Sequence, residues 1–128
     1  MAYYHLGEIV HRQALKYRHK TALKYQDPDG KWVGMFWESF SANITKTAQA
    51  MAEMGVKPGD NLGIYSQNME KYLITDFAAY ANRAVMVPMY ATASPAQVSY
   101  IVQDAAIRIL FVGEQFQYNN AWKVQQEN

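Results

Sequence analysis

Polar residues that could do chemistry follow a short apolar run in the stretch GVKPGDNLGIYSQN, residues 55–68. Residues 61–65 form that run and predict a buried strand, after which come Ser66, Gln67 and Asn68. Open parallel sheets bind ligands beyond the carboxyl ends of their strands, and the amino terminus of a helix attracts anions. These three side chains are therefore the best candidate for an anion-binding loop, although capping of the following helix is the commoner role of such residues.

Asp60, which directly precedes the same strand, is a second candidate, because a carboxylate can act as a general acid or base. It follows the Pro58-Gly59 pair, which turns the chain, and Gly55, which accepts the left-handed conformation found at helix ends. A lone aspartate beside a turn glycine most often accepts hydrogen bonds from the local backbone. We expect that structural role for Asp60.

No established catalytic or nucleotide-binding motif is found in the sequence. It lacks a Gly-rich dinucleotide fingerprint, a Walker-type phosphate loop, a Gly-x-Ser-x-Gly elbow and a His-Glu-x-x-His pair. His5, His11 and His19 have neither metal-ligand spacing nor a nearby carboxylate pair, and we predict that they lie on the surface. Residue types and spacing alone indicate an α/β domain with no visible active site.

The composition limits the classes of partner and compartment. The 128 residues carry a formal net charge of +1, so no basic excess points to nucleic acid. The chain has no cysteine, which excludes disulfides and thiolate metal sites and fits a reducing compartment. No apolar run approaches the roughly 20 residues of a membrane span, and the first residues lack the apolar core of a signal peptide. We therefore predict no transmembrane segment and a cytoplasmic location.

An amphipathic helix and a β-hairpin are predicted for residues 1–36. Six residues share one helical stripe: Leu6, Ile9, Val10, Gln13, Ala14 and Tyr17. Four basic residues lie mostly off that stripe: His11, Arg12, Lys16 and Lys20. Such a basic face could touch phosphates or lipid headgroups, but it is more often simply solvated, which is what we expect here. Residues 22–25 and 32–36 flank the turn sequence Asp-Pro-Asp-Gly and predict the hairpin.

Helices and strands alternate in residues 37–128. Three apolar runs predict strands, 61–65, 84–88 and 107–112, and Pro88 is expected to mark the end of the second. The predicted helices are one of about 17 residues that begins at Trp37, one at 69–81, one that begins at Pro95 and one at 114–128. Because crossovers between such strands are right-handed, the three strands are predicted to form a parallel sheet with helices on its faces.

The apolar spacing within these helices predicts which side chains are buried. The stripe expected for helix 69–81 consists of Tyr72, Leu73, Phe77 and Tyr80, while Ala78 and Ala79 allow close approach to a sheet. Ser94, Pro95 and Gln97 predict a capped start for the next helix, because serine and glutamine at this spacing form a reciprocal capping box. The last helix has a weaker stripe of Phe116, Tyr118, Ala121, Trp122 and Val124.

Three stretches of the chain resemble, in their order and spacing, the amino-terminal portion of the AMP-forming, adenylate-forming enzymes. They are Trp37 to Phe40, GVKPGDNLGIYSQN and AYANRAVMVPMYATASPAQVSYIVQDAAIRILFVG. That superfamily includes acyl-CoA synthetases, firefly luciferase and peptide-synthetase adenylation domains. The positions that match the family pattern are Gly55, Val56, Gly59, Asp60, Asn68, Ala84, Val87 and Pro88. The run Val-Pro-Met-Tyr-Ala-Thr, with Ser-Pro-x-Gln and Tyr100-Ile101 after it, is more similar to the long-chain fatty acid members than to the peptide-synthetase type.

The chain departs from the family pattern at two places. Phe36 and Ser39 stand where the family has the Thr and Glu of a capping box, so this helix start is expected to be capped in another way. Arg83 stands where the family has glycine, and a positive φ there carries a steric cost unless Asn82 takes that conformation instead.

The resemblance implies an ATP-dependent long-chain fatty acid–CoA ligase, which converts fatty acid, ATP and CoA to acyl-CoA, AMP and pyrophosphate through an acyl-adenylate. The family holds ATP, Mg and CoA with a Thr/Ser/Gly-rich loop ending in Pro-Lys-Gly, a magnesium-binding Glu, a ribose-binding Asp and a Lys in a mobile carboxyl-terminal domain. Residues 1–128 contain none of these motifs, so no catalytic, cofactor-binding or metal residue is carried over. We expect the chain by itself to bind none of these cofactors and to be inactive.

The resemblance further implies that residues 1–128 are a single N-terminal subdomain, a partial domain of a larger enzyme. A stand-alone α/β binding or assembly module without catalysis is the alternative. A sheet cut midway leaves an unpaired strand edge and uncovered apolar helix faces. We therefore favour the partial domain, with the remainder of the enzyme chain as its partner, and expect the isolated chain to self-associate.

Overall fold

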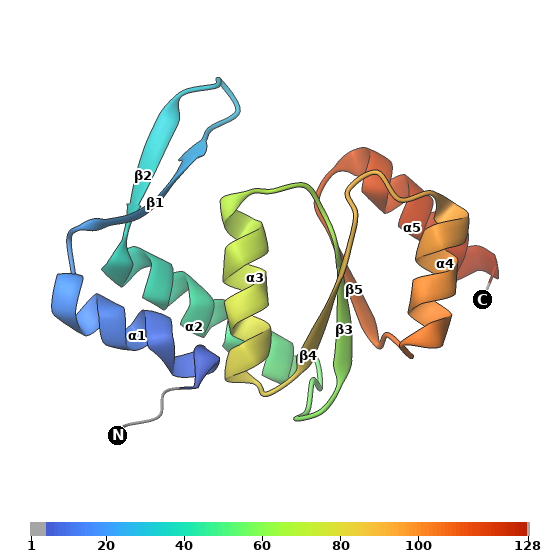
Figure 1. The fold of residues 1–128 in the computed structure, drawn as a ribbon, viewed down its shortest axis with the longest axis horizontal. Coiled ribbons are helices and arrows are strands. Elements are labelled where there is room, and N and C mark those ends of the chain that lie inside the picture. The colour runs from blue at the N-terminus through green and yellow to red at the C-terminus, as the bar shows by residue number, and fades with distance from the viewer. Residues whose placement is uncertain (1–4, 128) are drawn as a thin grey trace.

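The computed structural model describes residues 5–127, which form an antiparallel hairpin, a parallel sheet and the helices around them (Figure 1). The elements are α1 (Leu6–Tyr17), β1 (Thr21–Gln26), β2 (Trp32–Phe36), α2 (Trp37–Glu53), β3 (Asn61–Tyr65), α3 (Glu70–Ala81), β4 (Val85–Met89), α4 (Pro95–Asp104), β5 (Ile109–Val112) and α5 (Gln115–Glu127). Residues 1–4 and 128, at the two ends of the predicted elements, lie outside the described residues.

The predicted three-stranded parallel sheet is confirmed, with strand order β4-β3-β5. β3 has the predicted bounds, but β4 begins one residue later than expected and β5 two residues later. The cause is that the N–H groups of Ala84 and Ile107 donate to the preceding helices, at Ala79 O (3.0 Å) and Val102 O (2.9 Å). These apolar residues therefore close a helix before the strand begins.

Pro88 does not end its strand, contrary to the prediction. It lies inside β4, paired in register with Ile64, and the strand continues to Met89. β4 is an edge strand of this sheet, so one side of its backbone has no strand beside it among residues 5–127. A proline, which has no N–H to donate, is tolerated in such a position.

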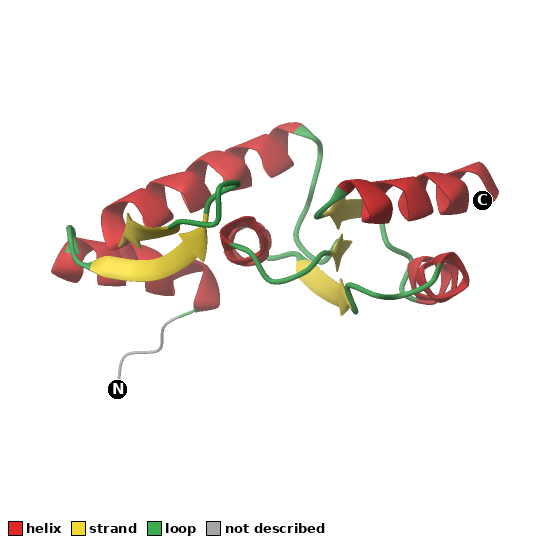
Figure 2. Cartoon of the chain, turned by 90° about the horizontal axis from the view of Figure 1, so that it is seen from above, coloured by secondary structure: helices red, strands yellow, loops and turns green. Residues whose placement is uncertain are grey.

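The two faces of the sheet pack against different helices. Figure 2 shows α3 on one side of the sheet and α4 and α5 on the other. Leu62, Met86, Ile109 and Phe111 belong to the core shared with α1, α2 and α3. Tyr65, Met89, Leu110 and Val112 belong to the core shared with α4 and α5. The alternation follows from the period of two residues in a strand, and it confirms that helices cover both faces.

Three of the predicted helical stripes need correction. In α1 only Val10 and Ala14 are buried, while Leu6 and Ile9 are exposed. In α3 the close approach expected at Ala78 and Ala79 is confirmed, since both are fully buried, but Ile74 is the third buried residue instead of the expected Tyr72, Leu73, Phe77 and Tyr80. Alanine at the contact lets the helix backbone approach its neighbours closely, and the aromatic rings lie at the margin, where Phe77 meets Phe40 edge to face.

The last helix buries Val124 as expected, but the aromatic residues of the predicted stripe are not buried. Gln117 and Val124 are its buried residues, while Phe116, Tyr118 and Trp122 are about half exposed. Gln117 is tolerated in the core because both ends of its amide are paired. Its Nε2 donates to Ala91 O (3.1 Å), and its Oε1 accepts from Glu114 N–H (2.8 Å).

Backbone carbonyls replace the missing capping box at the start of α2. Phe36 makes no side-chain cap, but the N–H groups of Trp37 and Glu38 donate to Lys20 O and Arg18 O, each at 3.1 Å. The predicted capping box of α4 is present, with Gln97 N–H donating to Ser94 Oγ (3.2 Å) and Ser94 N–H to Gln97 Oε1 (2.8 Å).

The helices formed by residues 5–127 include none with the length and apolar character that crossing a bilayer requires.

Candidate functional site

The carboxyl-terminal edge of the sheet brings together the loops that follow β3 and β5. Ser66 and Gln67 lie directly against Gly113, where a Cβ would be 2.3 Å from Ser66 Oγ and 2.8 Å from Gln67 Oε1. Gly113 N–H also donates to Tyr65 O at 3.0 Å. The absence of a side chain at Gly113 is therefore what allows these two loops to meet.

The predicted capping role of Ser66, Gln67 and Asn68 is wrong. The N-cap of α3 is Met69, which makes no side-chain hydrogen bond, and Ser66 Oγ instead donates to Gln67 O at 2.8 Å. Ser66 is buried toward β5, whereas Asn68 is exposed. Sequence spacing could not show this, because the contact with Gly113 depends on β3 and β5 being neighbours.

A network of buried polar groups joins the remaining loops at this edge. Tyr65, which is fully buried, donates its hydroxyl to Ala93 O at 2.6 Å and accepts from Asn120 Nδ2 at 3.1 Å. Gln117 links the loop after β4 to the start of α5 through the contacts described above. These bonds fix the positions of the loops, so the edge has the character of a structural junction.

An open groove of about 900 Å³ separates this edge from the hairpin. Its lining includes Lys24 and Lys71 but also Glu70 and Glu114, so charges of both signs face the groove. Gln67 Oε1 is buried there without a hydrogen-bond partner among residues 5–127. The two lysine ammonium groups are donors, but Asp27 raises the number of carboxylates in the groove to three, and the Gln67 oxygen can only accept. The lining therefore does not favour a phosphate. Binding of an anion by this loop therefore stays a prediction from sequence alone.

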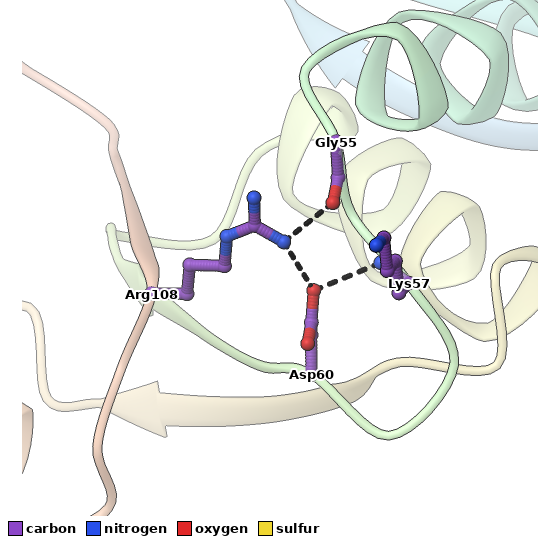
Figure 3. Close-up of polar contacts among 4 residues, drawn as sticks. All are labelled: Gly55, Lys57, Asp60 and Arg108. Atoms are coloured by element: carbon purple, nitrogen blue, oxygen red, sulfur yellow. Dashed lines mark hydrogen bonds and ion pairs between the residues drawn. The ribbon is translucent and has the colours of Figure 1, made fainter.

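Asp60 lies at the opposite end of β3, where it accepts two hydrogen bonds (Figure 3). Lys57 N–H donates to Asp60 Oδ2 at 2.8 Å, as expected for a turn aspartate, and Arg108 Nη1 donates to the same oxygen at 2.7 Å. Arg108 Nη1 also donates to Gly55 O. The backbone bond, followed by the guanidinium, holds the pKa of the Asp60 carboxyl below its usual value.

Sequence reasoning did not identify Arg108 as the partner of Asp60. The available signal was a single charged residue that interrupts an otherwise apolar run at 107–112. The guanidinium connects the start of β5 to the turn before β3, and its Nη2 lies 3.0 Å from where a Cβ on Gly55 would be. Because the Asp60 carboxylate is held at the other end of β3 from Ser66, the structure does not combine the two sequence candidates into one site.

His5 and His19 make structural contacts at the surface. His5 Nδ1 accepts from Gly7 N–H at 3.0 Å and so caps α1, and His19 Nε2 lies 3.2 Å from Glu38 Oε2. His5, His11 and His19 are exposed, as predicted. Over residues 5–127, no group of three or more His, Asp or Glu side chains is arranged to hold a metal ion.

Comparison with protein families gives a match that covers most of the chain. The family described as AMP-binding enzyme matches residues 10–128. Among curated relatives, the long-chain-fatty-acid–CoA ligase FadD15 of Mycobacterium bovis is 35% identical over 83 residues, which is 65% of this chain and 14% of that protein. The acyl-CoA ligase sidI of Aspergillus fumigatus is 28% identical over 109 residues, 84% of this chain and 18% of that protein.

Solved structures show that the fold is shared. A fatty acyl CoA synthetase of Mycobacterium tuberculosis superposes with a TM-score of 0.80 at 20% identity, over 96% of this chain and 23% of that chain. A coronafacic acid ligase of Pectobacterium brasiliense superposes with a TM-score of 0.86 at 18% identity, over 97% of this chain and 24% of that chain. The chain thus spans about a quarter or less of the length of the proteins that it matches here.

Proposed function

Because the chain belongs to the family of AMP-binding enzymes, we propose that it is the amino-terminal subdomain of an ATP-dependent ligase that joins a long-chain fatty acid to CoA. In the whole enzyme a fatty acid carboxylate oxygen attacks the α-phosphorus of ATP, and pyrophosphate leaves. The CoA thiol then attacks the acyl carbon of the adenylate and AMP leaves, which gives the thioester. The observation that carries this proposal is the family match over residues 10–128 together with 35% identity to a long-chain-fatty-acid–CoA ligase.

Within that enzyme we assign this subdomain a structural role. Residues 5–127 bring together no metal-ligating group, and the polar side chains at the carboxyl edge of the sheet are used in contacts between loops. The magnesium and nucleotide contacts are therefore assigned to other parts of the enzyme. The chain provides the sheet and the surfaces on which those parts are built. We assign the whole enzyme to fatty acid metabolism in the cytoplasm.

Two surfaces support the need for such a covering partner. β4 and β5 are the two edge strands of the sheet, and Val85 on β4 is 50% exposed. On α5, Tyr118 and Trp122 stack with ring centroids 6.5 Å apart and are each about half exposed. Unpaired strand edges and exposed aromatic side chains promote association. We assign them to contact with the remainder of the enzyme and, in the isolated chain, to self-association.

The isolated chain tests the assigned lack of catalysis. It is incubated with palmitate, CoA, magnesium and ATP, and pyrophosphate release is measured beside a long-chain-fatty-acid–CoA ligase of the same family as positive control. We expect no release above background and no ATP binding by calorimetry. Pyrophosphate release by the purified chain contradicts the structural role. Light scattering at rising concentration checks self-association, and a stable monomer throughout contradicts that part of the proposal.

A further inference from the structure

The last helix, α5, contains a stretch whose side-chain pattern fits a strand better than a helix. Residues 115–122 read QFQYNNAW and include no charged residue, no proline and no glycine. The aromatic residues Phe116, Tyr118 and Trp122 are separated by even numbers of positions, and Gln or Asn occupies four of the five remaining positions. Alternation of aromatic and amide side chains in an uncharged stretch is typical of segments that stack as cross-β assemblies.

The helical conformation leaves these aromatic rings at the surface. Residues two positions apart lie on opposite sides of a helix, so α5 cannot bury all three rings on one face. Phe116 is 48% exposed, Tyr118 50% and Trp122 52%. In an extended conformation, successive side chains point to opposite faces, which places the three rings together on one face. The period of the stretch and the structure that it adopts here are therefore in conflict.

Few buried groups hold α5 to the rest of the molecule. Its buried residues, among those that the structure describes, are Gln117 and Val124. The side-chain amides of Gln117 and Asn120 donate to Ala91 O and to the Tyr65 hydroxyl, each at 3.1 Å. The helix also lies at the end of the molecule remote from the hairpin in both views (Figures 1 and 2). A peripheral helix that buries little apolar surface opens at a lower free energy than the sheet beneath it.

Charged residues border the stretch but do not enter it. Glu114 precedes it and Lys123 follows it, and such flanking charges are typical of segments prone to β-aggregation. Stacked copies of the stretch would therefore bring no like charges together inside it. The apolar runs of β3 and β5, in contrast, are already paired with each other in the parallel sheet.

We propose that residues 115–122 are a switch segment, which leaves the helix and stacks with the same residues of other copies of this chain as a cross-β assembly. In such a stack each backbone group pairs with the copy above or below it, the amide side chains form ladders, and the aromatic rings stack. The partner is a further copy of this chain, because identical stretches bring identical amides and rings into register. The charges at the two borders limit the stack to the switch segment.

This assembly is separate from the ligase function and from the native contacts assigned to α5. Association through the exposed rings of the folded chain keeps α5 helical, whereas cross-β stacking converts its residues to strand. Circular dichroism therefore distinguishes the two modes of self-association, and neither ATP, CoA nor fatty acid enters the test.

The test is incubation of the 128-residue chain with agitation, followed by thioflavin T fluorescence, circular dichroism and fibre diffraction. We expect fibres with reflections at about 4.7–4.8 Å and about 10 Å, and a loss of helical signal as they form. Asn119→Lys places a charge inside the switch segment, and Gln126→Lys places the same charge at another exposed position of α5, outside it. We expect Asn119→Lys to prevent the fibres or to lengthen their lag phase several-fold, and Gln126→Lys to behave like the original chain.

Asn119→Gln separates the charge from helix propensity. Glutamine and lysine are both better helix formers than asparagine, but glutamine preserves an uncharged amide ladder. We therefore expect Asn119→Gln to form fibres with a lag close to that of the original chain. A lag as long as that of Asn119→Lys shows that helix stability, and not stacking of the stretch, sets the rate, and it contradicts the proposal.

A second pair of variants tests the aromatic rings. Tyr118→Gln/Trp122→Gln removes two exposed rings from the switch segment, whereas Tyr90→Gln/Tyr100→Gln removes two that are 87% and 69% exposed elsewhere. We expect only the first pair to lengthen the lag, and thermal unfolding checks that each variant starts folded. Absence of fibres from the original chain, assemblies that stay helical, or equal lags in the matched variants overturn the proposal.

Discussion

A methyl group at Gly113 tests the contact between the loops at the carboxyl edge of the sheet. Gly113 is not among the residues with positive φ, so Gly113→Ala requires no unusual backbone and its effect is steric. The new Cβ would lie 2.3 Å from Ser66 Oγ and 2.8 Å from both Ser66 Cβ and Gln67 Oε1. One loop must move, which also weakens the bond from Gly113 N–H to Tyr65 O. Overpacking costs about 1–3 kcal/mol and the hydrogen bond about 1 kcal/mol, so we expect a loss of about 2–4 kcal/mol.

The measurement is urea unfolding followed by circular dichroism, with Gly34→Ala as a matched control. A Cβ at Gly34 meets only Thr21, at 3.4 Å or more, so this variant is expected to change the unfolding free energy by less than about 0.5 kcal/mol. Ser66→Gly removes the atoms that clash and is expected to restore part of the stability of Gly113→Ala. If Gly113→Ala and Gly34→Ala unfold at the same urea concentration, the loops do not meet as described.

Three further predictions concern the Asp60 carboxylate, the backbone at Arg83 and the cap of α4. Because the pKa of Asp60 is lowered in the folded chain, its contribution to stability is present above about pH 4 and is lost as the pH falls through the folded value. Between pH 6 and pH 3, Asp60→Asn should therefore lose less unfolding free energy than the original chain. An equal loss in the two proteins contradicts the pairing of Asp60 with Arg108. Arg83→Gly should raise the unfolding free energy by up to about 1 kcal/mol in urea titrations, because φ at Arg83 is +56°; a decrease argues against strain there. Ser94→Ala should lower it by about 1 kcal/mol with loss of the capping box, and Ser99→Ala inside α4 serves as the comparison.

The order of helices and strands could be predicted from the sequence because the turn and capping residues lie where the spacing of the apolar residues changes, along most of the chain. β3 has the predicted bounds because a turn precedes its apolar run and polar residues follow it. The ends of helices were harder to place. Three helices, α2, α3 and α4, end in the same way, with a residue of positive φ followed by a hydrogen bond that closes the last turn. The residues of positive φ are Gly55, Arg83 and Ala106, and only at Gly55 does a glycine indicate the helix end in the sequence.

The side-chain contacts at the two ends of the sheet depend on tertiary structure and left little trace in the sequence. Asp60 and Arg108 are 48 residues apart, and only the pairing of β3 with β5 brings them together. Ser66 was predicted to cap α3 because its residue type and its position after β3 fit that role, but its side chain packs against Gly113 instead. In α3 the close approach at Ala78 and Ala79 could be predicted from their small size, whereas the apolar spacing wrongly placed the larger side chains Tyr72, Leu73, Phe77 and Tyr80 in the buried stripe.

Exchange of this subdomain into a related enzyme tests the central claim most directly. In FadD15 of Mycobacterium bovis, the segment that aligns with this chain is replaced by the residues of this chain, and palmitoyl-CoA formation is measured. A structural subdomain of the same ligase family should support thioester formation at a reduced rate, and Gly113→Ala in the chimera should lower the amount of folded, active enzyme. A chimera that is folded by circular dichroism and gel filtration but forms no palmitoyl-CoA contradicts the assignment.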